Sequence, residues 1–271
     1  MTMKRAVVIL FFLCSLFILI TMLEFYRSAQ HGGNGEFPHA TSLNGNSVLN
    51  ILRMALPTHV VPERIDFCSN RAPKNIFFDV GSNRGDVLHA FLYKQHLHNS
   101  NNPNWKFAEE YDPATYDVYG FEAIPSFAKS LEHKFQNVHI VNAAVWNESG
   151  KEVSISIDPD KKNSNWGSSL IRKWSRDNVT VNTLDFAAFV KERVCLKDNV
   201  HLKLNIEGSE YVVMDHLIKT DTLQLFDCVY MYFHVLFFPQ KEKANITNKT
   251  VNYQKIVKQL GIKIAVWSVH V

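Results

Sequence analysis

The sequence predicts an α/β fold in which a doubly wound, mostly parallel sheet follows an N-terminal transmembrane helix. Short apolar runs alternate with helix-like stretches from residue 75 onward, which is the order that builds parallel sheets. The first run, at 76–80, passes through a glycine-containing loop into a helix-like stretch at 87–94, a connection typical of open α/β sheets. Residues 6–23 form an uncharged stretch of 18 residues, long enough to span a bilayer.

The N-terminal apolar stretch is interpreted as a signal anchor. Lys4 and Arg5 precede it, so the positive-inside rule makes 1–5 a cytoplasmic tail and places the rest of the chain in the lumen. The alternative is a cleaved signal peptide, but Tyr26 and Arg27 stand where small residues would be needed for cleavage. We therefore expect a single-pass type II membrane protein of the Golgi or endoplasmic reticulum. Residues 24–74 would form a stem and lead-in, and 75–271 the globular domain.

Two further features agree with a lumenal domain. Asn-x-Ser/Thr triplets, which are acceptors for N-linked glycans, begin at four positions: Asn147, Asn178, Asn245 and Asn248. Three cysteines lie outside the anchor, and an oxidising lumen permits one disulfide. We expect the pair Cys68–Cys195, because Cys228 opens an apolar run and reads as a buried thiol. The net charge of +3 is small and its basic residues are dispersed, which argues against nucleic-acid binding.

The remaining elements are expected in alternating order along the domain. Strands are predicted at 118–122, 138–145, 152–157, 178–183, 200–206, 228–233 and 262–269. Helices are predicted at 125–135, 184–194, 211–219 and 251–260. The polar segment 96–117 is longer than ordinary connections, and we expect it to border the site. Residues 158–174 are expected to be a loop in which Gly167, Ser168 and Ser169 either close over a ligand or form an ordinary turn.

The loop after the first strand is the clearest candidate site. Asp79 lies near the end of the strand, and the loop carries Gly81, Asn83 and Gly85. Glycine lets the backbone turn tightly and approach a ligand, and the following helix offers unpaired N–H groups. The spacing is neither that of a dinucleotide fingerprint nor that of a P-loop. A plain strand-to-helix turn is the competing interpretation.

Two later strand ends carry further candidates. Glu122 ends the second strand, where an acidic residue typically accepts hydrogen bonds from ribose hydroxyls, although it could also cap the next helix. Asn142 and Ala143 lie at the end of the third strand, where an amide and a small side chain would suit a base, or simply pack.

A second set of polar residues lies at the end of the strand predicted at 200–206. Strand alternation predicts that Lys203, Asn205 and Glu207 share one face, and three polar residues on one face are costly unless they have partners. His234 ends the next strand and is expected at the same edge, either as a functional residue or as a structural one.

Read together, six segments in order resemble the FkbM-type family of S-adenosylmethionine-dependent methyltransferases. They are FDVGSNRGD (78–86), GFEAIP (120–125), NAAVW (142–146), GSSL (167–170), VNTLDFAAFV (181–190) and LKLNIEGSEYVVMDHL (202–217). The resemblance covers about 75–270. It implies a Rossmann-like methyltransferase fold and O-methyl transfer to a hydroxyl group. S-adenosylmethionine is the implied cofactor.

The resemblance also assigns roles by position. Cofactor binding falls to Asp79, Gly81, Asn83, Gly85 and Glu122, and the end of the third strand adds Asn142 and Ala143 as candidates. The catalytic-edge block matches Lys203, Asn205, Glu207, Gly208 and Glu210. We take Lys203, Asn205 and Glu207 as catalytic candidates and add His234 from its place at the end of the next strand, and no residue is assigned to a metal. This chain departs from the family pattern in having Asn205 in place of an aspartate and Tyr232 in place of an acidic residue. An asparagine cannot carry charge or take up a proton at neutral pH.

Two functional hypotheses follow. The first is a membrane-anchored, lumenal O-methyltransferase whose acceptor is a glycan, a small molecule or another component of the secretory pathway. The second is a catalytically silent relative that keeps the fold as a binding or scaffolding module, which the departures at Asn205 and Tyr232 favour.

Overall fold

The computed structural model describes residue 68 and residues 70–94, 111–159, 167–172 and 177–267. All of them lie within one compact unit, Thr58–Val271. Among these residues no helix is long and apolar enough to cross a membrane. The predicted anchor at 6–23, the stem and most of the 96–117 segment fall outside the described residues, so those assignments stay predictions.

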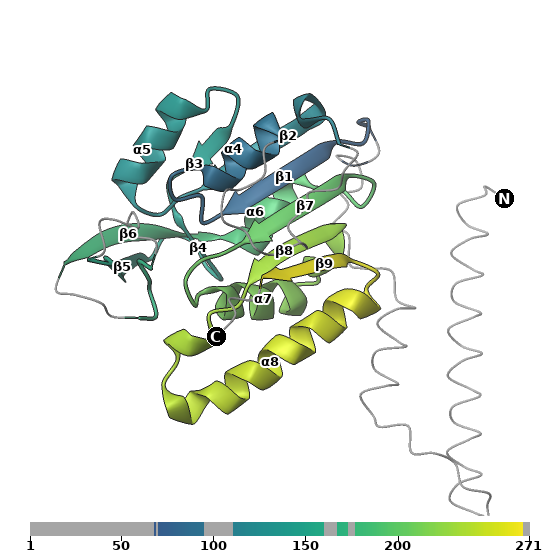
Figure 1. The fold of residues 1–271 in the computed structure, drawn as a ribbon. Helices are drawn as coiled ribbons and strands as arrows, with labels where there is room; N and C mark the ends of the chain where they lie inside the picture. Colours follow the sequence, from purple (N-terminus) through teal and green to yellow (C-terminus); the bar gives the residue numbers. More distant parts are fainter. Residues whose placement is uncertain (1–67, 69, 95–110, 160–166, 173–176, 268–271) are drawn as a thin grey trace, which may run out of the picture. The chain divides into compact units, whose positions relative to one another are not determined.

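A six-stranded parallel sheet forms the centre of the unit (Figure 1). Its strands lie in the order β3-β2-β1-β7-β8-β9, and each neighbouring pair is parallel. This arrangement confirms the predicted doubly wound α/β fold. The strand bounds are β1 Asn75–Val80, β2 Tyr116–Phe121, β3 His139–Val141, β7 Asn199–Leu204, β8 Cys228–Tyr232 and β9 Lys263–Trp267.

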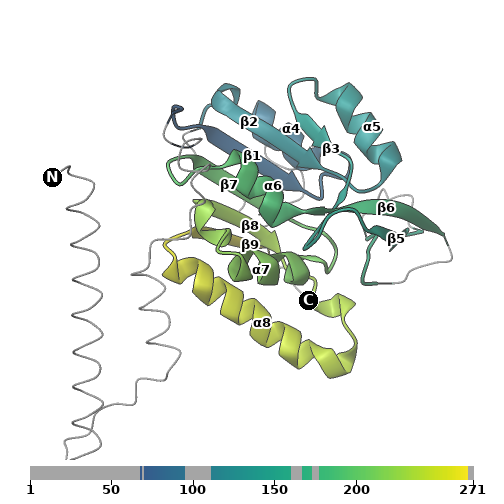
Figure 2. The same ribbon diagram turned by 180° about the vertical axis from the view of Figure 1, so that it is seen from behind.

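Helices cover both faces of this sheet, as the opposite views of Figures 1 and 2 show. On one face Phe77 packs with Leu88 and Leu131, from α4 and α5. On the other face Phe78 packs in a larger core to which α6, α7 and α8 contribute. The helices are α4 Asp86–Tyr93, α5 Pro125–Lys134, α6 Phe186–Arg193, α7 Glu210–Lys219 and α8 Gln240–Gln259. Three short 3-10 helices are η1 Pro113–Thr115, η2 Leu223–Leu225 and η3 Val235–Phe237.

A second, three-stranded sheet has the order β4-β6-β5. Its strands are β4 Ala144–Trp146, β5 Glu152–Ser156 and β6 Asn178–Asp185. The β5 and β6 strands form an antiparallel ribbon beside the main sheet (Figure 1). An antiparallel bridge joins Ser156 to Ser169, which ties the 167–172 segment to this ribbon.

Several predicted element boundaries were wrong, among them the following three. The strand predicted at 138–145 is two strands in two sheets, since the chain leaves the main sheet at Asn142, whose side-chain amide instead donates to the backbone carbonyl of Glu122. The helix predicted to begin at 184 begins at Phe186, because β6 continues to Asp185, whose side chain caps that helix. The helix predicted at 251–260 begins at Gln240.

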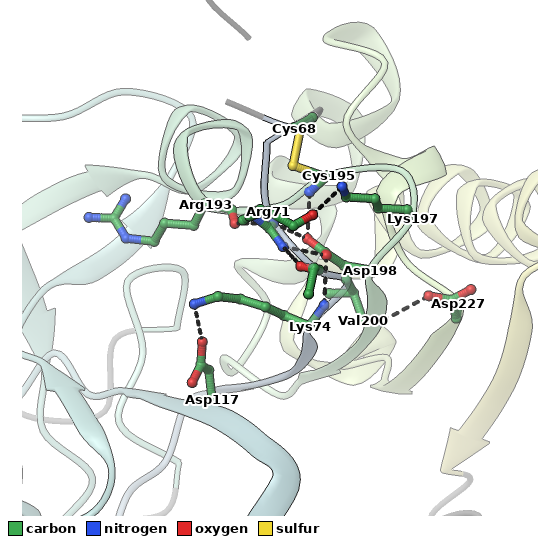
Figure 3. Close-up of polar contacts among 11 residues, drawn as sticks. Cys68, Arg71, Lys74, Asp117, Arg193, Cys195, Lys197, Asp198, Val200 and Asp227 are labelled. Atoms are coloured by element: carbon green, nitrogen blue, oxygen red, sulfur yellow. Dashed lines mark hydrogen bonds and ion pairs between the residues drawn. A yellow bond between two sulfur atoms is a disulfide. The ribbon is translucent and has the colours of Figure 1, made fainter. Parts of the chain in front are cut away.

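The segment before β1 is attached to the end of the main sheet at which β1 and β7 begin (Figure 3). The expected disulfide, Cys68–Cys195, is confirmed. Arg71 pairs with both carboxylate oxygens of Asp198, which also accepts hydrogen bonds from the backbone N–H groups of Lys74 and Cys195. A bidentate, partly buried pair of this kind is stronger than an exposed one.

The disulfide should carry a measurable share of the domain's stability. It joins residues 127 positions apart, and cross-links that close long loops contribute roughly 2–5 kcal/mol. We therefore expect the double variant Cys68→Ser/Cys195→Ser to lose free energy of unfolding in that range, measured by chemical denaturation. Reduction should lower the wild type to the level of the variant and leave the variant unchanged. Equal stability of wild type and variant would contradict this account.

Candidate active site

Loops from four strands converge at the carboxyl edge of the main sheet. They follow β1, β2, β7 and β8, and they meet because these strands run parallel. The chain proceeds outward from β1 to β3 and returns to the other side of β1 as β7. The strand order therefore reverses between β1 and β7, the position at which open α/β sheets bind ligands.

The glycine loop after β1 is shaped by close backbone contacts. The N–H groups of Gly81 and Ser82 both donate to the carbonyl oxygen of Phe121, at 3.0 and 2.9 Å. Gly81 has a φ of 83°, and a Cβ atom there would lie 2.0 Å from the carbonyl oxygen of Asn205. Position 81 therefore requires glycine, both because its φ is positive and because a Cβ atom would collide with the Asn205 carbonyl. Gly85, with a φ of 83°, forms the left-handed N-cap of α4.

A buried ion pair joins the ends of β1 and β7. Asp79 and Lys203 are register partners in the two strands, and Lys203 Nζ lies 2.8 Å from Asp79 Oδ1. The same ammonium group donates to the carbonyl oxygens of Val80 (3.3 Å) and Gly81 (2.6 Å). Its three N–H bonds are thus occupied within the protein, and Lys203 fixes the start of the glycine loop.

Glu122 is tied to the glycine loop rather than standing free at the end of β2. Its carboxylate accepts hydrogen bonds from the backbone N–H groups of Asn83 (2.7 Å) and Ile124 (2.8 Å). Burial raises its pKa, although both hydrogen bonds and Lys203 act in the opposite direction. Asn142 braces the same turn through its bond to the Glu122 carbonyl, at 2.9 Å. Ala143 lies half-buried next to it, between β3 and β4.

Acceptor atoms without donors gather at this edge. Within the described part of the chain, the buried side-chain oxygens that contact no donor are Asp79 Oδ2 and the Oδ1 atoms of Asn83 and Asn205. Asp79 Oδ1 has only its ion-pair contact with Lys203. Because buried acceptors are normally satisfied, this group indicates a place for a ligand that brings hydrogen-bond donors.

A second charged cluster surrounds His234. Its Nε2 lies 3.0 Å from Glu207 Oε2, and its Nδ1 lies 3.1 Å from Glu210 Oε1. Burial alone would lower the pKa of His234, but the hydrogen bonds to Glu207 and Glu210 outweigh it and raise that pKa to about 9. The ring is therefore cationic at neutral pH, with both nitrogens acting as donors. Glu207 is the more accessible carboxylate, its side chain being 17% exposed while that of Glu210 is fully buried.

The predicted shared face of Lys203, Asn205 and Glu207 was wrong. The strand β7 ends at Leu204, so alternation does not extend to the other two residues. Asn205 opens a turn, and its N–H donates to the carbonyl oxygen of Val80 at 3.1 Å. Glu207 adopts a left-handed conformation with a φ of 55°, which is uncommon for a residue other than glycine. The turn, rather than the strand, brings Glu207 to His234.

The structure shows the partners of two residues in segments that the sequence had already singled out. Glu210 anchors His234 through both ring and backbone, since its Oε1 also accepts the N–H of His234 at 2.8 Å. Ser169 Oγ donates to the carbonyl oxygen of Glu207 at 2.5 Å and so links the 167–172 segment to the turn. The E-G-x-E spacing and the GSSL segment were the available signals, but neither pattern indicates which partner each residue contacts.

Comparison with known protein families identifies the domain that contains this edge. The family model described as the methyltransferase FkbM domain matches residues 79–261. The chain belongs to this family. The match begins at Asp79 and extends past His234, so the FkbM domain contains every loop of the site. A search of curated proteins and a search of solved structures each found no match.

The FkbM domain shows no metal centre in its described part, where no three His, Cys, Asp or Glu side chains are placed to hold an ion. Two buried cations at the carboxyl edge, Lys203 and His234, contact carboxylates there.

Replacing Gly81 should destabilise the FkbM domain far more than replacing a glycine that shares only its conformation. Gly81→Ala adds both left-handed strain and a clash with the Asn205 carbonyl. The control, Gly150→Ala, has a φ of 80° but meets nothing within 4 Å. We expect about 1–2 kcal/mol of destabilisation for the control, from strain alone, and at least twice that for Gly81→Ala. Chemical denaturation measures both, and equal losses would contradict the proposed close approach.

His234 should make the stability of the FkbM domain pH-dependent. Its folded-state pKa of about 9 exceeds its ordinary value, so its contribution is fully present below about pH 6.5 and is lost as pH rises through 9. Charged or titratable groups facing the ring are Glu207, Glu210 and Tyr232. We expect the free energy of unfolding of the wild type to fall more steeply between pH 7 and 9 than that of His234→Gln. Parallel profiles would exclude this role.

Proposed function

We propose that this protein is an S-adenosylmethionine-dependent O-methyltransferase, held in a membrane by residues 6–23, with its FkbM domain in the lumen of the Golgi or endoplasmic reticulum. Its acceptor would be a glycan or another hydroxyl-bearing component of the secretory pathway. The observation that carries the proposal is the group of unsatisfied acceptors at the strand-order reversal of an FkbM domain.

The residues at this edge fit the cofactor. The amino group and ribose hydroxyls of S-adenosylmethionine are donors, and the unsatisfied oxygens of Asp79, Asn83 and Asn205 are acceptors. Glu122, held by backbone N–H groups, retains lone pairs for hydroxyl donors. Asp79, Asn83, Asn205 and Glu122 would therefore hold it, while Gly81 gives the backbone the space to approach it.

Glu207 is the group that we assign to the acceptor side of the reaction. When bound, S-adenosylmethionine supplies a methyl group on a positively charged sulfur, and a hydroxyl that receives it loses one proton. The side chain of Glu207 is 17% exposed, and His234 holds one of its carboxylate oxygens, Oε2, at 3.0 Å. The other oxygen, Oε1, would orient the acceptor hydroxyl and take its proton. His234, being charged, positions Glu207 and does not itself accept the proton.

A catalytically silent FkbM module is the second candidate, and the side chain of Asn205 favours it. Its buried Oδ1 has no donor in the described part of the chain, and an asparagine there cannot take up a proton. Tyr232, the other departure from the family pattern, packs against the His234 ring with ring centroids 4.3 Å apart. This candidate predicts cofactor binding without methyl transfer.

The lumenal placement has independent support from the described residues. The disulfide Cys68–Cys195 is of a kind that persists in oxidising compartments. The asparagines of all four glycan-acceptor triplets are exposed: Asn147, Asn178, Asn245 and Asn248. We expect the chain isolated from expressing cells to lose mass on treatment with an N-glycosidase. An unchanged mass would contradict the lumenal placement but would not affect the proposed methyltransferase activity.

Cofactor binding tests the proposal directly. We expect saturable binding of S-adenosylmethionine to the full-length chain by isothermal titration calorimetry. Asn83→Gly keeps the left-handed backbone of Asn83, whose φ is 49°, and removes its unsatisfied acceptor. It should weaken binding about tenfold, the effect of one buried hydrogen bond. The matched control is Asp221→Gly, which makes the same backbone change at an exposed position with a φ of 55°.

The absence of saturable binding would refute the cofactor assignment. Incubation with a labelled methyl donor and a panel of glycan, lipid and peptide acceptors then separates the two candidates. Labelled product supports the enzyme. If the cofactor binds but no methyl group is transferred, and if Asn205→Asp restores methyl transfer, the silent module is supported.

A further inference from the structure

The turn that carries Glu207 does not have the conformation that its own sequence favours. Its central residues, Glu207 and Gly208, have φ values of 55° and 100°, and the N–H of Ser209 donates to the carbonyl oxygen of Ile206 at 3.1 Å. Two positive φ values are those of a type I′ turn, which prefers glycine, asparagine or aspartate at its first central position. A glutamate followed by a glycine suits a type II turn, in which the glutamate has a φ of about −60°. Contacts from elsewhere in the fold therefore hold Glu207 in its left-handed conformation.

One peptide group in this turn is held at both ends. Its carbonyl oxygen, that of Glu207, accepts a hydrogen bond from Ser169 Oγ at 2.5 Å. Its N–H, that of Gly208, donates to Glu210 Oε2 at 2.9 Å. Because both atoms belong to one planar group, the two contacts fix its orientation and, with it, the conformation of Glu207. Glu210 follows the turn directly in α7, whereas Ser169 reaches it from the separate segment 167–172.

The hydroxyl group of Ser169 has one direction in which to donate. Its oxygen accepts the backbone N–H groups of Ile171 and Arg172, both at 3.0 Å. A serine hydroxyl has two lone pairs and one proton, so with both lone pairs occupied the proton is directed at the Glu207 carbonyl. The backbone of Ser169 is fixed as well, because its N–H and its carbonyl each bond to Ser156 at 3.0 Å. Ser169 therefore connects the end of β5 to the turn.

We propose that Ser169 is a positioning residue whose hydroxyl keeps Glu207 left-handed and thereby keeps the Glu207 carboxylate against His234. Without this bond the turn relaxes toward type II, and the φ of Glu207 changes by roughly 115°. Such a change swings the side chain away from the His234 ring, whose Nε2 now lies 3.0 Å from Glu207 Oε2. The role deepens the proposed function and rests on it, since Glu207 is the carboxylate assigned to the acceptor hydroxyl.

The pKa of His234 reports the position of Glu207 without any need for methyl transfer. Burial lowers this pKa, but the hydrogen bonds to Glu207 and Glu210 outweigh burial and raise it to about 9. NMR titration of the full-length chain measures it, with His234→Gln identifying the signal. Ser169→Ala should lower this pKa by about one unit or more, the effect of losing a nearby opposite charge. Glu207→Gln should lower it at least as far, and in the double variant the two changes should not add, because both remove the same contact.

A matched pair of variants and one control accompany this measurement. Ser169→Thr keeps a hydroxyl and should retain the wild-type pKa of His234, whereas the isosteric Ser169→Val should lower it as Ser169→Ala does. This pair makes the comparison if Ser169→Ala does not fold, which thermal unfolding checks. The control, Ser149→Ala, removes a hydroxyl that accepts the N–H of Asp185 and should leave the pKa unchanged. An unchanged pKa in a folded variant that lacks the Ser169 hydroxyl, or additive changes in the double variant, would overturn the positioning role.

Cofactor binding and methyl transfer separate this role from the proposed function. Ser169→Ala should bind S-adenosylmethionine with the wild-type Kd and lower the kcat of methyl transfer about tenfold or more, since a general base contributes on the order of 10²–10⁴. A wild type that does not bind the cofactor refutes the proposed function, and the titration of His234 still tests Ser169. A lowered pKa with an unchanged kcat supports the positioning of Glu207 by Ser169 and refutes the part assigned to Glu207 in the reaction.

Discussion

The contact between Asp79 and Lys203 is the constraint on which the rest of the carboxyl edge depends. It joins β1 to β7 at the position where the strand order reverses, and both side chains are almost fully buried. Burying two charges is costly, and the loss of one partner from such a pair costs about 3–5 kcal/mol. Lys203 recovers part of this cost by donating to two carbonyls of the glycine loop. The pair therefore fixes the loop as well as the strands.

The second cluster is arranged on the same principle. His234 is a buried cation between carboxylates, as Lys203 is, and it orders the turn that follows β7. In each cluster the cation is paired with carboxylates of the protein, and near the first cluster the buried oxygens of Asn83 and Asn205 remain without donors in the described part of the chain. The edge as a whole is thus rich in acceptors and poor in free donors. Such a surface discriminates in favour of a cationic, donor-bearing ligand.

How much of this could be predicted from the sequence depended on how local each feature was. The glycine loop and Glu122 could be located, because strand, turn and acidic residue follow one another in the chain. The division of 138–145 could not, since it depends on Asn142 bonding to the end of another strand. The first half of α8 is polar, with Ile246 as its one buried residue before Tyr253, so it carries little helical periodicity. The left-handed Glu207 breaks the alternation that placed it with Lys203.

The fastening of Cys68 and Arg71 has a mechanical consequence. Cys68 and Arg71 are attached where β1 and β7 begin, whereas the carboxyl edge lies one strand length away, about 20 Å for six residues. A pull on the N-terminal segment is borne by the disulfide and by Asp198, before it reaches the hydrogen bonds of β1. Tension on the chain is therefore kept from the glycine loop. An attachment through Cys68 therefore leaves the loops of the carboxyl edge at the opposite end of β1 and β7.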